Sequence, residues 1–378
     1  MKKQIGAIVC LVACGFFGGH CLAEDGVTAD TIVLGRSAGV TGPQAAPVHE
    51  NGAGAQLYFD VLNKHGGVNG RKIVLKTVDD GYDAKRTAEN VKHLIEQDKV
   101  FALFLIRGTA NTEAAMPIFT AARVPLIAPV SPATSMGEPL QKYIFNVRAR
   151  GHVEIEKIVE QLVTLGLKKI AVAYADDGLG KDVVAETEKA MRKYNITPVA
   201  EASFGRTAIE FDQQIKQIAR AEPQAVIVGA VARPTAAFVN AAKRAGLNPQ
   251  FFALSNTSSD AFIHDLGENG RGVGVSQVVP HPWSAGTPLV KEFLQAVKDH
   301  PDTPVTHASL EGYMSAKVLA EGLKRAGPQL TRERLISALE SMANVDIGGV
   351  RIAYSPEDHQ GSDFVELTVI GKDGQFMR

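Results

Sequence analysis

VFALFLIRGTANTEAAMPIFTAA, residues 100–122, is the stretch of the sequence that decides the fold. Residues 100–106 are all apolar, which is typical of a parallel β-strand that is buried on both faces. Thr109, Asn111 and Thr112 then offer side-chain oxygens where a helix must begin, and good helix formers follow. The stretch therefore predicts a strand, a short turn and a helix, which is the repeating unit of an α/β sheet.

The turn between this strand and this helix contains Arg107, Gly108 and Thr109 and is a candidate binding site. In an open α/β sheet the carboxyl ends of the strands face the ligand crevice. The free N–H groups at the start of a helix, together with the helix dipole, favour an anion at that place. We interpret the turn as a candidate carboxylate site, although an ordinary capped turn would have a similar sequence.

Similar units precede and follow this stretch. Strands are predicted before it at 31–38 and 72–78 and after it at 169–175, 198–204, 225–230 and 250–255, all separated by helical segments. Right-handed crossovers make such sheets parallel, and two successive units of similar size predict two lobes. Further helices at 289–299, 308–326 and 331–343 and strands at 349–354 and 364–370 are too many for the tail of one lobe. We therefore expect the chain to cross between the lobes more than once.

The first 23 residues have the features of a secretory signal peptide. Lys2 and Lys3 form a short basic region, residues 5–17 are largely apolar, and small residues end the segment at Ala23. Residues 11–14, LVAC, also resemble a bacterial lipobox, which would leave Cys14 lipidated. We predict export to the periplasm, and the lipoprotein alternative stays open.

Composition excludes several classes of site. Without the two signal lysines, the 40 basic residues become 38 against 41 acidic ones, a net charge of −3 that gives no indication of nucleic-acid binding. All three cysteines, Cys10, Cys14 and Cys21, lie in the signal. We therefore expect no disulfide, no thiol nucleophile and no cysteine-based metal site in the remaining 355 residues, a length that suggests two domains.

Motifs of catalysis and of cofactor binding are missing from the sequence. No G-x-G-x-x-G opens a helix after a strand, and neither G-x-S-x-G nor H-E-x-x-H occurs. His281 and His307 have no partners at metal-ligand spacing, so we assign them to the core or the surface. The acid pairs at 79–80 and 176–177 follow strands, and adjacent side chains point apart, so they favour turn capping. We predict a protein that is not an enzyme and has no cofactor or metal.

Several motifs along the chain resemble one family. They are TGP at 41–43, NKHGGVNGRKI at 63–73, DD at 79–80, VPLIAP at 124–129 and EGY at 311–313. Together they resemble the leucine/isoleucine/valine-binding proteins, the type I periplasmic solute-binding proteins of ABC transporters, and the similarity covers residues 27–375.

The resemblance implies a type I periplasmic binding protein fold. Two Rossmann-like lobes with parallel sheets would be joined by a hinge of three crossings, near Arg148, Val279 and Ser355, and would close on a solute. Lobe 1 would contain residues 24–147 plus 280–355, and lobe 2 would contain residues 148–279 plus 356–378.

The resemblance also implies ligand-binding positions. The family's carboxylate-binding hydroxyl falls on Thr109, beside Arg107 and Gly108. A second polar segment falls on Val130 and Ser131, where Pro132 occupies the usual hydroxyl position and Ser131 is the candidate substitute.

Other family positions have changed in this chain. The aromatic pocket positions fall on Pro47, Leu179 and Val231, and the acid that would hold an α-ammonium falls on Asn256. The two positions that a disulfide joins in branched-chain amino acid binders are Tyr82 and Gly108.

These changes bear on the ligand. Without the acid at Asn256, a buried ammonium would be left unpaired, which costs several kcal/mol. Arg107 stands at the pocket edge, with Arg148 and Arg150 at the first crossing, and an arginine fork suits a carboxylate. A surface ion pair is the open alternative for Arg107. We expect an organic acid, aromatic acids included, or a polar amide rather than a branched-chain amino acid.

The function that follows is that of an extracytoplasmic solute-binding protein of an ABC importer of the branched-chain amino acid type. It would capture a small carboxylate-bearing solute, an organic or aromatic acid or an amino acid. Its partners would be the permease and ATPase at the inner membrane, and the protein would be monomeric. The alternatives are a ligand sensor that signals to a membrane receptor and an NAD-dependent α/β enzyme, which would need the missing dinucleotide fingerprint.

Overall fold

A five-stranded parallel sheet forms the centre of the first lobe in the computed structural model, which describes residues 24–378. The predicted signal, residues 1–23 with all three cysteines, lies outside the described residues. The strand order is β2-β1-β3-β4-β5, with β1 at Thr31–Ala38, β2 at Lys72–Asp79, β3 at Ala102–Phe104, β4 at Leu126–Ile127 and β5 at Ile144–Phe145. Leu34 in β1 lies opposite Leu75 in β2 and Ala102 in β3, so the opening stretch supplies the middle of the sheet.

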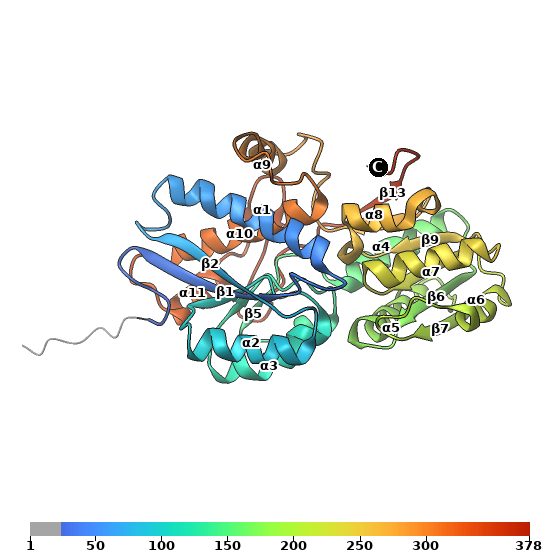
Figure 1. Cartoon of the computed structure of the whole chain (residues 1–378), viewed down its shortest axis with the longest axis horizontal. Coiled ribbons are helices and arrows are strands. Elements are labelled where there is room, and N and C mark those ends of the chain that lie inside the picture. The colour runs from blue at the N-terminus through green and yellow to red at the C-terminus, as the bar shows by residue number, and fades with distance from the viewer. Residues whose placement is uncertain (1–23) are drawn as a thin grey trace, which may run out of the picture.

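Helices cover both faces of this sheet (Figure 1). Their bounds are α1 at Ala45–Lys64, α2 at Ala84–Glu96, α3 at Thr109–Ala121, α9 at Pro288–Asp299, α10 at His307–Ala326 and α11 at Arg332–Glu340. Phe104 faces α1, where its ring lies 5.5 Å from that of Phe59, whereas Leu103 belongs to the core under α2 and α3 with Phe119. The alternation of side chains along β3 therefore supplies both halves of the core of the first lobe.

A seven-stranded sheet forms the second lobe. Its order is β14-β13-β10-β9-β8-β6-β7, with β6 at Ile170–Ala175, β7 at Ala200–Phe204, β8 at Ala225–Gly229, β9 at Gln250–Ala253, β10 at Gly274–Gln277, β13 at Glu366–Ile370 and β14 at Phe376–Met377. β13 runs antiparallel to β10, and β14 runs antiparallel to β13. The expectation of parallel sheets thus holds for β6 to β10 and is wrong for the edge formed by β13 and β14. The short connection at 371–375 can join β13 and β14 only as antiparallel neighbours.

The second sheet is also covered on both faces. Its helices are α4 at Gly151–Thr164, α5 at Gly178–Arg192, α6 at Asp212–Ala219, α7 at Ala232–Arg244 and α8 at Asp260–Leu266, and short 3₁₀ turns lie at Thr134–Met136, Ser255–Thr257 and Gly267–Gly270. Phe204, Phe211 and Phe238 pack together on the side of α6 and α7, with ring centroids 5.0–5.9 Å apart. Ile158 and Val183 belong to the separate core under α4 and α5.

Some predicted elements are shorter in the structure. Residues 100–106 are fully buried as expected, but regular pairing is confined to β3, and Leu105 has a left-handed φ of +53° that ends the strand. The helix expected at 331–343 ends at Glu340. The strand expected at 349–354 is the short β12 (Arg351–Ile352), which forms a separate hairpin with β11 (Val345–Asp346).

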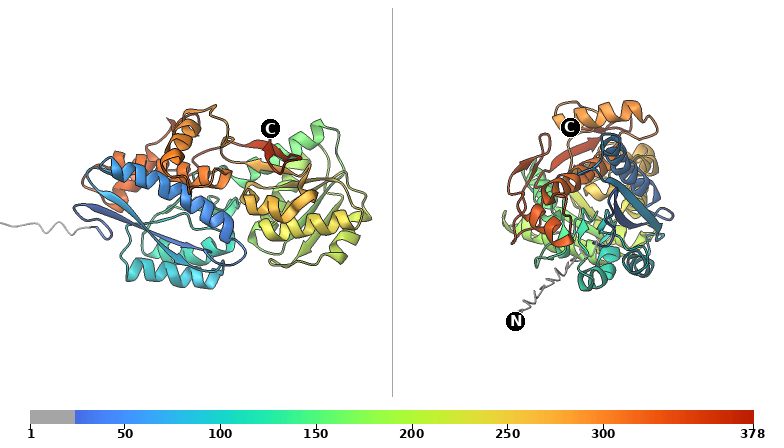
Figure 2. Two further views of the ribbon diagram at one scale, coloured as in Figure 1. Left: turned by 45° about the horizontal axis from the view of Figure 1, so that its top comes forward. Right: turned by 90° about the vertical axis from the view of Figure 1, so that its left-hand side faces the viewer.

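Three segments of the chain run between elements of the two lobes. They lie between β5 and α4, between β10 and α9, and between β12 and β13. Asn146 in the first segment pairs with Gln360 in the third. In Figure 2 the C-terminal strand lies next to the junction of the lobes. The residue boundaries of the lobes stay a prediction. Within residues 24–378, no helix has the length and apolar character needed to cross a membrane.

Candidate functional site

The carboxyl ends of strands from both sheets meet at a small cavity between the lobes. Its lining residues are Gln44, Tyr82, Arg107, Gly108, Thr109, Val130, Ser131, Pro132, Leu179, Val231 and Asn256. The cavity measures about 10 Å³, which is close to the minimum for one water molecule. Most of the residues predicted for the site line this interlobe cavity, as expected for a crevice at the carboxyl ends of α/β strands, but Pro47, Arg148 and Arg150 do not.

Two hydroxyl groups from the first lobe lie together in the cavity. The Oγ1 of Thr109 and the Oγ of Ser131 are 2.8 Å apart, and both side chains are buried. Ser131 Oγ also accepts a hydrogen bond from the backbone N–H of Ala133 at 3.2 Å. Thr109 is the first residue of α3, whose opening N–H groups have no partner inside the helix. This arrangement supplies several donors to one acceptor group, such as a carboxylate.

Arg107 crosses from the first lobe to the second. Its Nη2 donates to the backbone oxygen of Asn256 at 2.7 Å, and its Nε donates to Gln44 Oε1 at 3.1 Å. The side chain is only 5% exposed, so the alternative of a surface ion pair is wrong. Burial lowers the pKa of Arg107, and the nearby Glu311 opposes that effect. The cavity therefore has a cation in its wall that also links the two lobes.

Asn256 presents a hydrogen-bond acceptor to the cavity. Its Nδ2 donates to the backbone oxygen of Ala230 at 3.2 Å, which fixes the orientation of the amide. Its Oδ1 is buried and has no hydrogen-bond partner among residues 24–378. No acidic residue lines the cavity in the described part of the chain. The site thus combines a cation and donors with one neutral acceptor.

The prediction that the acid pairs cap turns is confirmed for three of the four acids, whereas Asp176 forms an ion pair with Lys181 at 3.0 Å. Asp80 accepts from the N–H of Tyr82 at 2.8 Å and also from Ser37 Oγ at 2.8 Å and Thr87 Oγ1 at 2.9 Å. Asp177 caps α5 by accepting from the N–H of Gly180 at 3.0 Å. Both carboxylates are used within their own lobe and do not line the interlobe cavity.

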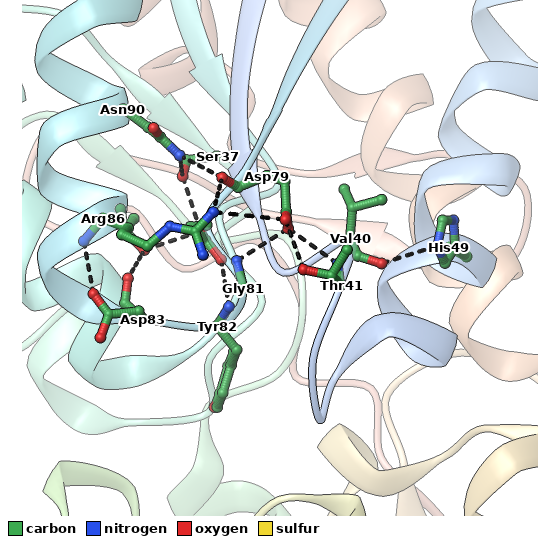
Figure 3. A network of polar contacts seen from close by, with 12 residues as sticks. Ser37, Val40, Thr41, His49, Asp79, Gly81, Tyr82, Asp83, Arg86 and Asn90 are labelled. Atoms are coloured by element: carbon green, nitrogen blue, oxygen red, sulfur yellow. Dashed lines mark hydrogen bonds and ion pairs between the residues drawn. The ribbon is translucent and has the colours of Figure 1, made fainter.

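A network around Asp79 shapes the turn that ends in Tyr82 (Figure 3). Asp79 accepts from the Thr41 hydroxyl at 2.6 Å and from the N–H groups of Thr41 and Gly81 at 3.0 Å. The Thr41 hydroxyl is the main cause that lowers the pKa of Asp79 to about 2. The N–H of Tyr82 donates to Asp80 at 2.8 Å. These contacts hold the backbone of Tyr82 at a left-handed φ of +64° and so place its ring.

Tyr82 and Gly108 are neighbours in the cavity wall. A Cβ atom on Gly108 would lie 2.8 Å from Cε2 of Tyr82, and Gly108 has a φ of +99°. Both facts require glycine at this position. The two positions that the resemblance assigned to a disulfide in branched-chain amino acid binders thus lie side by side, with an aromatic ring filling the space here.

Arg148 and Arg150 are not available to a ligand. Arg148 is buried and bonds to Glu154 at 3.0 Å and to Glu311 at 3.3 Å. Arg150 pairs with Glu138 at 2.7 Å and with Asp358 at 2.5 Å. The two arginines that the sequence places at the first crossing are therefore paired with acids of the protein and do not line the interlobe cavity.

The Arg148–Glu154 pair instead supports the segment that carries Asn256. Glu154 Oε2 accepts from the N–H of Ser255 at 2.9 Å and from Ser276 Oγ at 2.6 Å. Arg148 also donates to the hydroxyl of Ser255. The first crossing is therefore bonded directly to the residue that precedes Asn256.

The sequence analysis missed Gln44, and its assignment of Pro47 to the pocket is wrong. Pro47 is buried in α1 and does not line the cavity, whereas Gln44 precedes the helix and accepts from Arg107. The available signal was the position of Gln44 after the turn at 39–43, beyond the carboxyl end of β1. The direct role of Tyr82 in the cavity wall was also missed.

Comparisons with known proteins agree with this geometry. The sequence model described as periplasmic binding protein matches residues 31–375. The leucine-, isoleucine-, valine-, threonine- and alanine-binding protein of Pseudomonas aeruginosa is 25% identical over 348 residues, which are 90% of each chain.

Two solved structures have the same fold over nearly their whole length. The substrate-binding periplasmic protein of Ralstonia solanacearum is 33% identical, with a TM-score of 0.85 over 92% of this chain and 99% of that chain. A possible leucine/isoleucine/valine-binding protein of Rhodopirellula baltica is 27% identical, with a TM-score of 0.87 over 95% of this chain and 98% of that chain.

The resemblance seen in the motifs, the fold class and the expectation of a protein that is not an enzyme are confirmed. The chain belongs to the periplasmic binding protein family, whose members bind solutes and are not enzymes.

Proposed function

We propose that this protein is the solute-binding component of an ABC importer and captures a small carboxylate-bearing solute in the interlobe cavity. The carboxylate would accept hydrogen bonds from Thr109, Ser131 and the first N–H groups of α3. Arg107 would supply the balancing charge, and Asn256 Oδ1 would accept a hydrogen bond from a neutral hydroxyl or amide of the solute. Organic acids, aromatic acids and acids that carry an amide have this chemistry.

One observation carries the choice of solute class. Arg107 is the only charged residue of the cavity wall within the described chain. The sequence resemblance assigns Asn256 to the position of the family's ammonium-binding acid. An α-ammonium in this cavity would meet a buried cation and no acid, which costs several kcal/mol in a poorly solvated site. A carboxylate meets donors and a guanidinium that match it.

Entry of a solute requires the lobes to separate. A cavity of about 10 Å³ is far below the roughly 300 Å³ at which small-molecule pockets begin. We propose a hinge at the crossings near Arg148, Val279 and Ser355, between a first lobe of residues 24–147 plus 280–355 and a second of residues 148–279 plus 356–378. Opening would break the bond from Arg107 to Asn256, and closure on the solute would restore contacts from both lobes.

The cellular setting is also part of the proposal. We propose that residues 1–23 are removed on export and that the protein, as a monomer, delivers the solute to a permease and ATPase of the inner membrane. Membership of the periplasmic binding protein family supports the periplasmic location. A ligand sensor that signals to a membrane receptor would share the same fold and cavity. Genes for a permease and an ATPase beside this gene would favour transport, and a neighbouring receptor kinase gene would favour sensing.

A thermal-shift screen tests the solute class directly. The panel contains amino acids, unbranched and aromatic acids, and amides of those acids, each at several concentrations. A ligand that binds only the folded state raises the melting temperature, and the rise grows with the logarithm of the ligand concentration relative to Kd. We expect the largest shifts from carboxylates that lack an α-ammonium. Shifts from amino acids alone would show that the proposed chemistry is wrong.

A further inference from the structure

A larger cavity adjoins the interlobe cavity and is not used by the proposed contacts. It measures about 340 Å³ and shares Tyr82 and Val231 with the interlobe cavity. Pro43 and Tyr82 line it from the first lobe, and Ile209 and Arg233 line it from the second. A cavity with walls from both lobes closes when the lobes close, so its contents would be held together with the solute in the interlobe cavity.

The apolar wall of this outer cavity is partly open to solvent. Ile209 is 63% exposed although it is a large aliphatic residue, and Val231 forms the boundary with the interlobe cavity. A hydrocarbon or aromatic segment of a ligand would cover these side chains and remove apolar surface from water.

Two guanidinium groups give the outer cavity a positive charge. Arg206 lies over the ring of Tyr82 at 4.4 Å, donates to Asn111 Oδ1 at 2.8 Å and lies 3.5 Å from Asp177. The atom of Arg206 nearest Asp177 is its buried Nε, which is within ion-pair distance of Asp177 Oδ2 and makes no hydrogen bond within residues 24–378. Arg233 is exposed, and in the described chain no acid lies within ion-pair distance of it. One arginine is thus largely balanced by Asp177, and the other is free to bind an anion.

We propose that the outer cavity is a second subsite, which receives the far end of an elongated solute and favours a second anionic group there. The inference rests on the proposed carboxylate site and adds to it: one carboxylate lies at Thr109, an apolar body passes Tyr82 and Val231, and the second anionic group lies near Arg233. α,ω-Dicarboxylates have this chemistry.

The test is a calorimetric titration with matched probes. Adipate, suberate and sebacate are compared with hexanoate, octanoate and decanoate, which have the same chain lengths and lack the second carboxylate. We expect the dicarboxylate of suitable length to bind about fivefold more tightly than its matched monocarboxylate, the effect of one partly screened ion pair. The advantage should shrink as ionic strength rises.

Variants on α7 identify the residue responsible. Arg233→Gln should abolish the advantage of the dicarboxylate and leave the affinity for the monocarboxylate within about twofold, and Arg233→Lys should retain part of the advantage. Arg244→Gln is the control, because it removes an exposed arginine from the last turn of the same helix. It should leave both affinities unchanged.

The outcomes separate this inference from the proposed function. Binding of monocarboxylates without any gain for dicarboxylates at any length would overturn the second subsite alone. An equal loss of both ligands in Arg233→Gln would overturn the specific contact with the distal group. Failure of both series to bind, with amino acids binding instead, would overturn the carboxylate site together with the inference built on it.

Discussion

Replacing Thr109 by valine removes the hydroxyl that we place against the solute carboxylate. Valine has nearly the same shape as threonine, so the backbone of α3 and the packing of the cavity should be kept. In the closed structure the change removes one buried hydrogen bond, the 2.8 Å contact with Ser131. Ser131 keeps its bond from the Ala133 N–H. The free energy of unfolding should therefore fall by about 1 kcal/mol.

The effect on binding should be larger than the effect on stability. A hydroxyl donor to a buried charged acceptor contributes about 1–3 kcal/mol, which is roughly 5- to 150-fold in Kd. The assay is isothermal titration calorimetry with the carboxylate that gives the largest thermal shift, together with chemical denaturation of the variant.

Thr112→Val is the matched control. Thr112 Oγ1 is also buried in the first turns of α3, but it donates to the backbone oxygen of Gly108 at 2.9 Å and does not line the interlobe cavity. The control should lose stability by a similar amount and keep its affinity within about twofold. Unaltered affinity in Thr109→Val, or an equal loss in Thr112→Val, would refute the reasoning.

Three further predictions concern charge, pH and closure. Asn256→Glu should supply the missing acid and reverse the ligand preference, so that an α-amino acid binds better than the matched carboxylate without the ammonium. Calorimetry of the variant with such a pair of ligands checks this, and an unchanged order of affinities would contradict it. Burial raises the pKa of Glu50 from 4.5 to about 7. As pH rises, the unfolded chain therefore loses this proton at a lower pH than the folded chain does. The free energy of unfolding should fall as pH rises from 4.5 to 7. Chemical denaturation at several pH values checks this, and the Glu50→Gln variant should show a smaller fall. Small-angle scattering should show compaction when ligand is added, and an unchanged radius with saturating, tightly bound ligand would count against the hinge.

The sequence was most informative where local pattern and topology coincide. The apolar run at 100–106 and the polar turn after it specify a buried strand and the start of a helix, and the carboxyl ends of such strands meet in one crevice. Thr109 and Arg107 could therefore be placed at the site before the partners across the cleft were known. Asn256 was placed by the family resemblance, and the structure adds that its Oδ1 has no partner in the described chain.

The errors arose where distant residues decide the outcome. Arg148 bonds to Glu311, which is 163 residues further along the chain, and Arg150 bonds to Asp358, 208 residues away. No local sequence pattern reveals such pairing. The sequence therefore left both arginines as candidate ligand contacts, but in the folded chain both are paired with acids. Gln44 lies just before α1 and lines the cavity, whereas Pro47, about one turn of helix further on, is buried inside α1.

The most direct test is calorimetry on the unmutated protein with leucine and 4-methylpentanoate. The two ligands have the same carboxylate and the same branched carbon chain, and they differ only by the α-ammonium group. A cavity that offers donors and Arg107 but no acid in its described wall should bind 4-methylpentanoate more tightly than leucine. Binding of leucine at micromolar or tighter affinity, with weaker binding of 4-methylpentanoate, would contradict the carboxylate-selective site.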